Sequence, residues 1–264
     1  MKSLVGQALV LAFLALLPAS ILAHYSMVLP QENSSRMGQP VTIIYQWGHP
    51  FEHQLGDAAP PDALTIWTPA GNKVDMAKKI EPIDLTAADS KKVRAFRFQF
   101  TPHERGDFIV VLRTPPIWME EDAAFIQDNV QVVLHVQAQK GWDASWGKGF
   151  EMTPLTRPYG LQPGMVFQAR IRGDGRPLAG TLVEIEHYNS TPPAALPPDE
   201  HITRTAKTDS DGVITVSLLE PGWWGLTASR DGGKKEHHGK TYPIRERVTL
   251  WVFVDDPKKT RSPQ

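Results

Sequence analysis

The stretch "VTIIYQW", residues 41–47, decides the fold class of this chain. Its β-branched and aromatic residues follow a period of two, which is typical of a strand with one buried face. Four further runs of this kind lie before residue 138, at residues 64–68, 94–100, 107–113 and 130–137. Glycine, proline and aspartate turns separate them, and so many short strands in about a hundred residues predict a β-sandwich.

The second half of the chain repeats this pattern. Its β-branched and aromatic runs are residues 166–172, 181–188, 202–207, 213–218, 225–229 and 248–254. The sequence therefore predicts an all-β protein made of two immunoglobulin-like β-sandwich domains in tandem. We place the N-terminal domain at residues 24–138 and the C-terminal domain at residues 153–256.

The segment between the two halves, residues 139–152, is rich in glycine but carries Trp142 and Trp146. Because tryptophan side chains bury a large apolar area, we expect this linker to pack and to hold the domains as a semi-rigid pair. Beyond the second domain, we expect residues 257–264 to form a disordered tail.

Residues 1–23 have the layout of a secretory signal peptide. Lys2 supplies an early positive charge, a run rich in leucine and alanine follows, and Pro18 precedes a short segment that ends in Ala23. The apolar run is too short to span a bilayer. We expect cleavage after Ala23, which makes His24 the first residue of a mature periplasmic protein.

Composition restricts the partners and the chemistry. The chain contains no cysteine, and its formal net charge of −1 comes from charges of both signs mixed along the sequence. We therefore expect cores without disulfides, and the charge balance argues against nucleic acid as a partner. No later segment has the length and apolarity of a membrane span, so we expect none in the mature chain. The sequence has no phosphate-binding glycine loop or nucleophile elbow, and we expect a protein that is not an enzyme.

His24 at a free N-terminus would be a metal chelator by itself. Its α-amine and its imidazole can bind one ion, and one more imidazole completes the T-shaped arrangement called a histidine brace. Nickel and copper both favour surroundings rich in nitrogen. The alternative is that signal cleavage merely exposes a histidine at the start of a strand.

The segment "HPFEH", residues 49–53, is the densest cluster of candidate ligands. It matches the H-x-x-E-H motif of inverted zinc proteases, but that motif needs a helix, and Pro50 disfavours a helical His49. A loop at the end of a strand is the better interpretation. There His49, Glu52 and His53 would meet His24 if the N-terminal strand lies beside this one. The alternative is a turn in which Glu52 bonds backbone amides and the histidines are solvated.

His187, in "EIEHYN", is the candidate ligand of the second half. It shares a strand face with Ile185, which points it towards the core or the domain interface. His237 and His238 form either a solvated pair in a polar hairpin or an auxiliary metal-capture loop. His135 alternates with apolar neighbours and is better explained as a strand residue than as a ligand.

Five segments carry a family resemblance: "AHYSMVLP", "WGHPFEH", "RPYGLQPG", "GDGRPLAGTLVEIEHYN" and "TAKTDSDGVITVSLLEPGWWGLTA". They resemble the NikK-like periplasmic proteins associated with nickel and cobalt uptake, which are largely catalogued as a domain of unknown function. The last two also share hairpin features with carboxypeptidase-regulatory-like and CnaB-like sandwiches. The resemblance implies two immunoglobulin-like domains and a periplasmic accessory that binds nickel or cobalt or presents it to a membrane transporter.

The sequence and the resemblance together predict an exported, non-catalytic protein that binds a divalent transition metal, nickel or cobalt first and copper as the alternative. The predicted ligands are His24, His49, Glu52, His53 and His187. A histidine-brace copper protein, either a CopC-like carrier or a polysaccharide monooxygenase, is the first alternative function. A structural or adhesion sandwich that binds no metal is the second.

Overall fold

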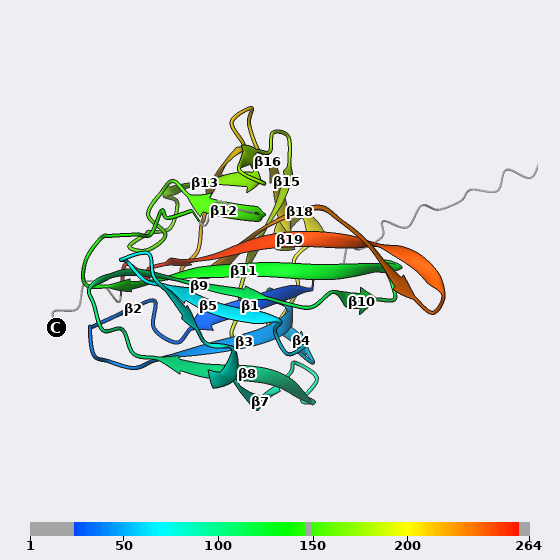
Figure 1. Ribbon diagram of the computed structural model, residues 1–264, viewed down its shortest axis with the longest axis horizontal. Coiled ribbons are helices and arrows are strands. Elements are labelled where there is room, and N and C mark those ends of the chain that lie inside the picture. The colour runs from blue at the N-terminus through cyan, green and yellow to red at the C-terminus, as the bar shows by residue number, and fades with distance from the viewer. Residues whose placement is uncertain (1–23, 146–148, 259–264) are drawn as a thin grey trace, which may run out of the picture.

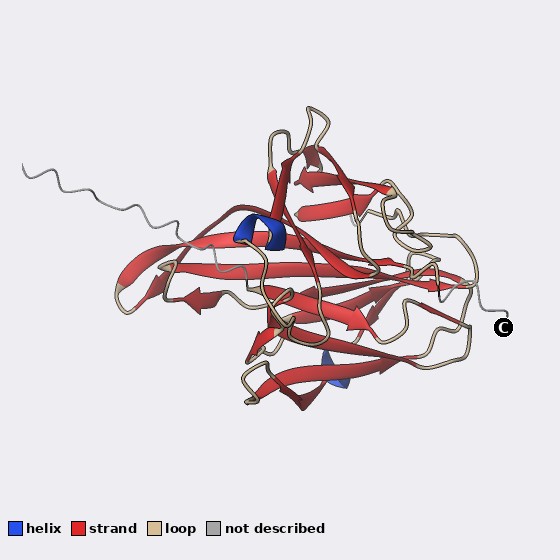
Figure 2. Ribbon diagram, turned by 180° about the vertical axis from the view of Figure 1, so that it is seen from behind, coloured by secondary structure: helices blue, strands red, loops and turns tan. Residues whose placement is uncertain are grey.

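A computed structural model describes residues 24–145 and 149–258 (Figure 1). The predicted signal peptide lies outside the described residues, as do Trp146 and residues 259–264 of the predicted tail. Strands make up nearly all of the regular structure, so the all-β prediction is confirmed. Figure 2 shows two short helical segments, η1 (Ala77–Lys79) and α1 (Asp199–Ile202). Within the described part of the chain, no helix is long and apolar enough to cross a membrane.

The strands form three sheets. The first contains, in order, β1 (Tyr25–Pro30), β3 (Val41–His49), β8 (Lys92–Phe100) and β7 (Glu81–Thr86), with β4 (Gln54–Gly56) paired to β3. The second and largest runs through β16 (Arg204–Lys207), β15 (Leu182–His187), β18 (Gly222–His237), β19 (Lys240–Val254), β11 (Ala124–Val136), β9 (Gly106–Arg113), β5 (Ala63–Trp67) and β6 (Lys73–Asp75). Two short strands, β10 (Ile117–Met119) and β2 (Ser34–Ser35), also pair with β11. The third sheet contains β12 (Phe150–Pro154), β13 (Val166–Gly173), β14 (Arg176–Pro177) and β17 (Val213–Ser217).

Two sandwiches result because the large sheet is covered by a different small sheet over each of its halves. In Figure 1, β7 and β8 lie below the long strands β11 and β19, and β12 and β13 lie above them. Ile43 and Phe98 of the first sheet share a core with Leu64 of the large sheet, and Phe167 of the third sheet shares the other core with Leu226. Each such buried side chain stabilises the fold by roughly 1.5–3 kcal/mol.

One continuous sheet joins the two halves of the chain. Strand β11 of the first half pairs in parallel with β19 of the second, from Phe125 opposite Ile244 to Val132 opposite Trp251. The cores occupy the two halves that the sequence indicates, except that Trp251 belongs to the first core. The domain boundaries at residues 138 and 153 stay predictions.

The linker packs against the large sheet at Trp142, which lies against a small cluster formed by Ile109, Val133 and Tyr159. Next to this cluster the buried carboxylate of Asp107 accepts three hydrogen bonds. Its donors are His135 Nδ1 at 2.7 Å, the Lys140 amide at 2.8 Å and the Tyr159 hydroxyl at 3.0 Å. His135 therefore shares the Asp107 carboxylate with the linker amide of Lys140, and the two hydrogen bonds hold the start of the linker against the sheet.

Trp251 ties the two halves together most directly. Its indole is fully buried in the first core, and its Nε1 donates to the Ser26 carbonyl at 3.1 Å. A Cβ atom at Gly225 would lie 3.0 Å from a ring carbon of Trp251, so that glycine makes room for the indole.

We predict that Trp251→Ala lowers the free energy of unfolding by about 3–5 kcal/mol, because it empties a large volume in the first core. Chemical denaturation followed by far-UV circular dichroism measures this loss, with Trp223→Ala, a partly buried neighbour, as the control. Since the two halves share a sheet, both should unfold in one transition. Two separate unfolding transitions, of which Trp251→Ala shifts only one, would contradict this account.

Candidate functional site

The structure brings His24 and His49 together. Strand β1 pairs antiparallel with β3, and the last paired residues, Tyr25 and Gly48, place His24 opposite His49 one step further along. The two imidazole centroids lie 4.2 Å apart with the rings tilted by 56°. The indole of Trp47 covers the His24 ring at 4.4 Å and 9°, which is a parallel stack.

His49 is held in place by a tight turn. The preceding Gly48 has φ +144°, and a Cβ atom there would lie 2.2 Å from the carbonyl oxygen of Gln54. Only glycine fits this close approach of β3 and β4. His49 itself is 6% exposed, and burial lowers the pKa of its imidazole. At neutral pH this ring is therefore neutral and keeps a lone pair for a ligand.

A cleft of about 310 Å³ opens beside the two histidines. Its lining consists of His24, His49, Gln54, Leu55, Gly56, Ala87, Ala88 and Asp89. Asp89 forms an exposed ion pair with Lys91 at 2.6 Å, so its charge is already compensated. The cleft gives a small ion access to the imidazole pair.

A buried ion pair from the large sheet fixes the start of β1. Asp128 and Arg247 are opposite each other in the parallel register of β11 and β19, and they are 1% and 4% exposed. Arg247 Nε and Nη2 donate to the two Asp128 oxygens at 2.6 and 2.9 Å. Ser26 Oγ donates to Asp128 Oδ2 at 2.7 Å, and Arg247 Nη2 also donates to the His24 carbonyl at 2.7 Å. The ion pair thus holds the chain on both sides of Tyr25, through Arg247 at His24 and through Asp128 at Ser26.

The rest of the "HPFEH" segment faces the second half of the chain. The amide of Asn189 donates to the Pro50 carbonyl at 3.0 Å, and its side chain donates to the Phe51 carbonyl at 2.7 Å. His53 Nδ1 lies 2.9 Å from the Asn189 carbonyl. The turn at residues 50–53 is therefore a contact between the halves, and the structure does not bring His53 to the histidine pair.

Two carboxyl groups lie at this contact. Glu186 is 2% exposed, and it accepts hydrogen bonds from the Phe51 amide at 3.1 Å and the Thr203 hydroxyl at 2.8 Å. Burial raises the pKa of Glu186 to about 7, and the charges of Glu52 and Glu184 add to the rise. Burial likewise raises the pKa of Glu52, whose Oε2 has no hydrogen-bond partner among the described residues.

His187 and the pair of His237 and His238 lie elsewhere. His187 Nε2 is 2.9 Å from the Pro221 carbonyl, and its ring lies 4.9 Å from that of Trp224. His237 stacks on Trp118 at 4.4 Å near the end of the β18–β19 hairpin. Within residues 24–145 and 149–258, no three histidine, aspartate or glutamate side chains come together as a metal site. The structure thus brings His24 and His49 together but not the five predicted ligands.

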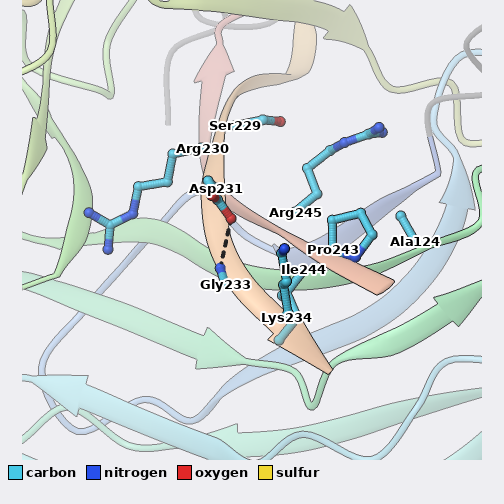
Figure 3. A pocket seen from close by; sticks show the side chains of 9 residues that line it. All are labelled: Ala124, Ser229, Arg230, Asp231, Gly233, Lys234, Pro243, Ile244 and Arg245. Atoms are coloured by element: carbon cyan, nitrogen blue, oxygen red, sulfur yellow. Dashed lines mark hydrogen bonds between the residues drawn. The ribbon is translucent and has the colours of Figure 1, made fainter. Parts of the chain in front are cut away.

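A second hollow, of about 350 Å³, lies on the β18–β19 hairpin (Figure 3). Two of its four charged side chains, Arg230 and Arg245, are ion-paired. Arg230 bonds Glu246 at 2.7 Å and Asp174 at 3.1 Å, and Arg245 lies 3.5 Å from Asp122. This hollow offers no cluster of donors comparable to the imidazole pair.

Sequence reasoning missed Trp47, Arg247 and Glu186. Trp47 could have been found, because it lies two residues before His49 on the strand expected to lie beside His24. Arg247 carries no local signal, since 223 residues separate it from the carbonyl group that it bonds. Glu186 carries no local signal either, because one of its partners is the Phe51 amide in the distant turn at residues 50–53.

The comparisons with known proteins identify the family. Residues 21–232 match the family described as "Domain of unknown function (DUF4198)", and the chain belongs to that family. No curated protein is significantly similar to it in sequence.

Solved structures with similar folds are distant. The chain is 10% identical to a DUF4785 family protein from Legionella pneumophila, with a TM-score of 0.29, over 78% of this chain and 52% of that one. It is 8% identical to two fibronectin type III domains of chicken tenascin, with a TM-score of 0.23, over 88% of this chain and 100% of that one. It is 18% identical to a candidate carbohydrate-binding protein from Pseudomonas aeruginosa, with a TM-score of 0.22, over 42% of this chain and 82% of that one. These likenesses carry no argument about function.

The contact at Glu186 predicts a pH dependence of stability. In the unfolded chain this carboxyl group loses its proton near 4.5, and in the folded protein only near about 7. The folded protein therefore binds more protons between these values, so the free energy of unfolding should fall as pH rises from about 4.5 to about 7. The lost amount should be on the order of 1–3 kcal/mol.

Glu186→Gln should reduce this decline, leaving the part due to the raised pKa of Glu52, and should make the protein more stable than the native chain at pH 8, because the amide keeps both neighbours without a charge. Urea denaturation at pH 5 and pH 8 measures the difference between the two proteins. That comparison isolates Glu186 from His49, whose lowered pKa acts in the opposite direction. Equal pH profiles for both proteins would show that Glu186 is not the cause.

Proposed function

We propose that this is an exported periplasmic protein that binds a divalent transition metal ion at His24 and His49 and presents it to a membrane transporter for nickel or cobalt. The observation that carries the proposal is the 4.2 Å approach of the two imidazoles beside an open cleft. The protein acts by binding, without turnover. The resemblance to nickel-uptake-associated proteins supports the choice of nickel or cobalt.

The donors fit such an ion once the signal peptide is removed. Mature His24 then offers its α-amine and its imidazole, and His49 offers a third nitrogen. Burial keeps His49 neutral, and the stack on Trp47 restricts the plane of the His24 ring. Three nitrogen donors suit nickel and copper better than magnesium, calcium or manganese.

Glu52, His53 and His187 are not ligands in this proposal. Glu52 and His53 belong to the turn that contacts the second half, and His187 bonds the Pro221 carbonyl. Glu52 and His53 thus lie in the contact between the two halves that follows β3, and His187 bonds a carbonyl group within its own half.

A copper carrier is the second candidate. The same set of an amine and two imidazoles is a histidine brace, and copper(II) binds nitrogen ligands more tightly than nickel does. Because copper would win a direct competition at any such site, growth of a deletion strain on limiting nickel or on limiting copper is the measurement that separates the two functions.

The direct test adds one glycine before His24 of the mature protein. This change converts the α-amine to an amide and leaves the imidazole and the folded sandwich unchanged. We predict that the dissociation constant for Ni²⁺ rises at least about tenfold, equal to roughly 1.4 kcal/mol, as measured by isothermal titration calorimetry. His49→Ala should weaken binding by a similar factor.

The matched control is the double variant His237→Ala with His238→Ala, which removes two imidazoles far along the β18–β19 hairpin. It should bind Ni²⁺ as tightly as the native protein, and the melting temperature without metal should change little in the glycine-extended protein. If the extended protein binds Ni²⁺ with native affinity, the terminal histidine is incidental and a structural or adhesion role becomes the better account.

A further inference from the structure

We propose that Arg247 is a positioning residue that decides which atoms of His24 bind the metal ion. By engaging the carbonyl oxygen of His24, it leaves the α-amine and the imidazole as the only donors of that residue. This inference rests on the proposed function, since it concerns the metal site at His24 and His49.

An N-terminal histidine has three donors that can reach one ion. The amine can chelate together with the imidazole, or together with its own carbonyl oxygen. The first mode is all nitrogen, whereas the second includes an oxygen and suits harder cations. A free peptide has both modes available, so a selective protein needs a feature that excludes the second.

Arg247 provides that feature through a short, charge-assisted bond. Its Nη2 donates to the His24 carbonyl oxygen at 2.7 Å, a donor–acceptor distance in the short range of charge-assisted hydrogen bonds. A metal cation on the same oxygen would lie next to the guanidinium charge and would be repelled by it. It would also leave a buried N–H group without its acceptor.

The guanidinium cannot turn aside to admit the ion. Its other contacts fix it to Asp128 in a two-point fork at 2.6 and 2.9 Å, and both side chains are almost fully buried. Asp128 is itself held by the Ser26 hydroxyl at 2.7 Å. The network therefore holds the chain at His24, just before β1, and at Ser26 within β1, and it directs the carbonyl group of His24 towards Arg247.

The network explains how a strand from the far end of the chain sets metal preference. His24 directly precedes β1 and Ser26 lies in it, whereas Asp128 comes from β11 and Arg247 from β19. Removing the bond from Arg247 should not abolish metal binding. It should instead admit chelation through oxygen and reduce the preference for nitrogen-seeking ions.

The test uses the mature protein beginning at His24, with Cu²⁺ as a spectroscopic probe and Ni²⁺ and Mn²⁺ for selectivity. The variant is Arg247→Lys, which keeps a positive charge beside Asp128 but replaces the planar fork by a single ammonium group. Arg230→Lys is the matched control, because Arg230 is also ion-paired in the β18–β19 hairpin but does not contact His24.

We expect Arg247→Lys to move the visible d–d band of bound Cu²⁺ to longer wavelength and to weaken nitrogen hyperfine splitting in the electron paramagnetic resonance spectrum. The ratio of the Mn²⁺ to the Ni²⁺ dissociation constant should fall at least about tenfold, about 1.4 kcal/mol. Arg230→Lys should give native spectra and a native ratio.

A native spectrum and a native ratio in Arg247→Lys would overturn the inference, and so would an equal loss of affinity for all ions with a native spectrum, which indicates a merely structural role. If the native mature protein binds none of these ions, the proposed function itself fails. Should Arg247→Lys not fold, the double variant Arg247→Met with Asp128→Leu removes both buried charges together, a replacement that is often neutral or stabilising. The same Cu²⁺ spectra of this double variant then show whether the carbonyl oxygen of His24 binds the ion.

Discussion

The buried ion pair between Asp128 and Arg247 is the interaction on which the rest of the structure depends. Two charges removed from water are costly unless every donor and acceptor is satisfied, and here the satisfying groups come from β1. The Ser26 hydroxyl and the His24 carbonyl complete the network. The pair thereby joins β11, β19 and the N-terminal strand, and it places the first described residue of the chain opposite His49.

The contacts between the two halves of the chain position the two strands at whose ends His24 and His49 lie. Trp251 and Arg247 hold β1 from one side, and the turn at residues 50–53 holds the end of β3 through Asn189 and Glu186. The imidazole pair lies between these two attachments. The second half thus contributes no ligand to the proposed centre, but it determines the positions of both strands that carry the ligands.

The sequence predicted what depends on local pattern. The alternation in residues 41–47 correctly indicated a strand, and the idea that the N-terminal strand lies beside it correctly placed His24 near His49. Proximity in sequence did not bring His53 to the histidine pair, because a turn with φ +55° at His53 directs that residue to Asn189. The pairing of β11 with β19 and the contact of Arg247 with His24 join residues more than a hundred positions apart, and no periodicity encodes such pairings.

The central claim is that His24, with a free amine, is the first residue of the exported protein and is held by Arg247 opposite His49. The most direct measurement is intact-mass and N-terminal peptide analysis of the protein recovered from the exported fraction. The account predicts a mature chain that begins at His24 with an unmodified α-amine. A chain that begins at Tyr25 or later, or one that retains residues before His24, would contradict it.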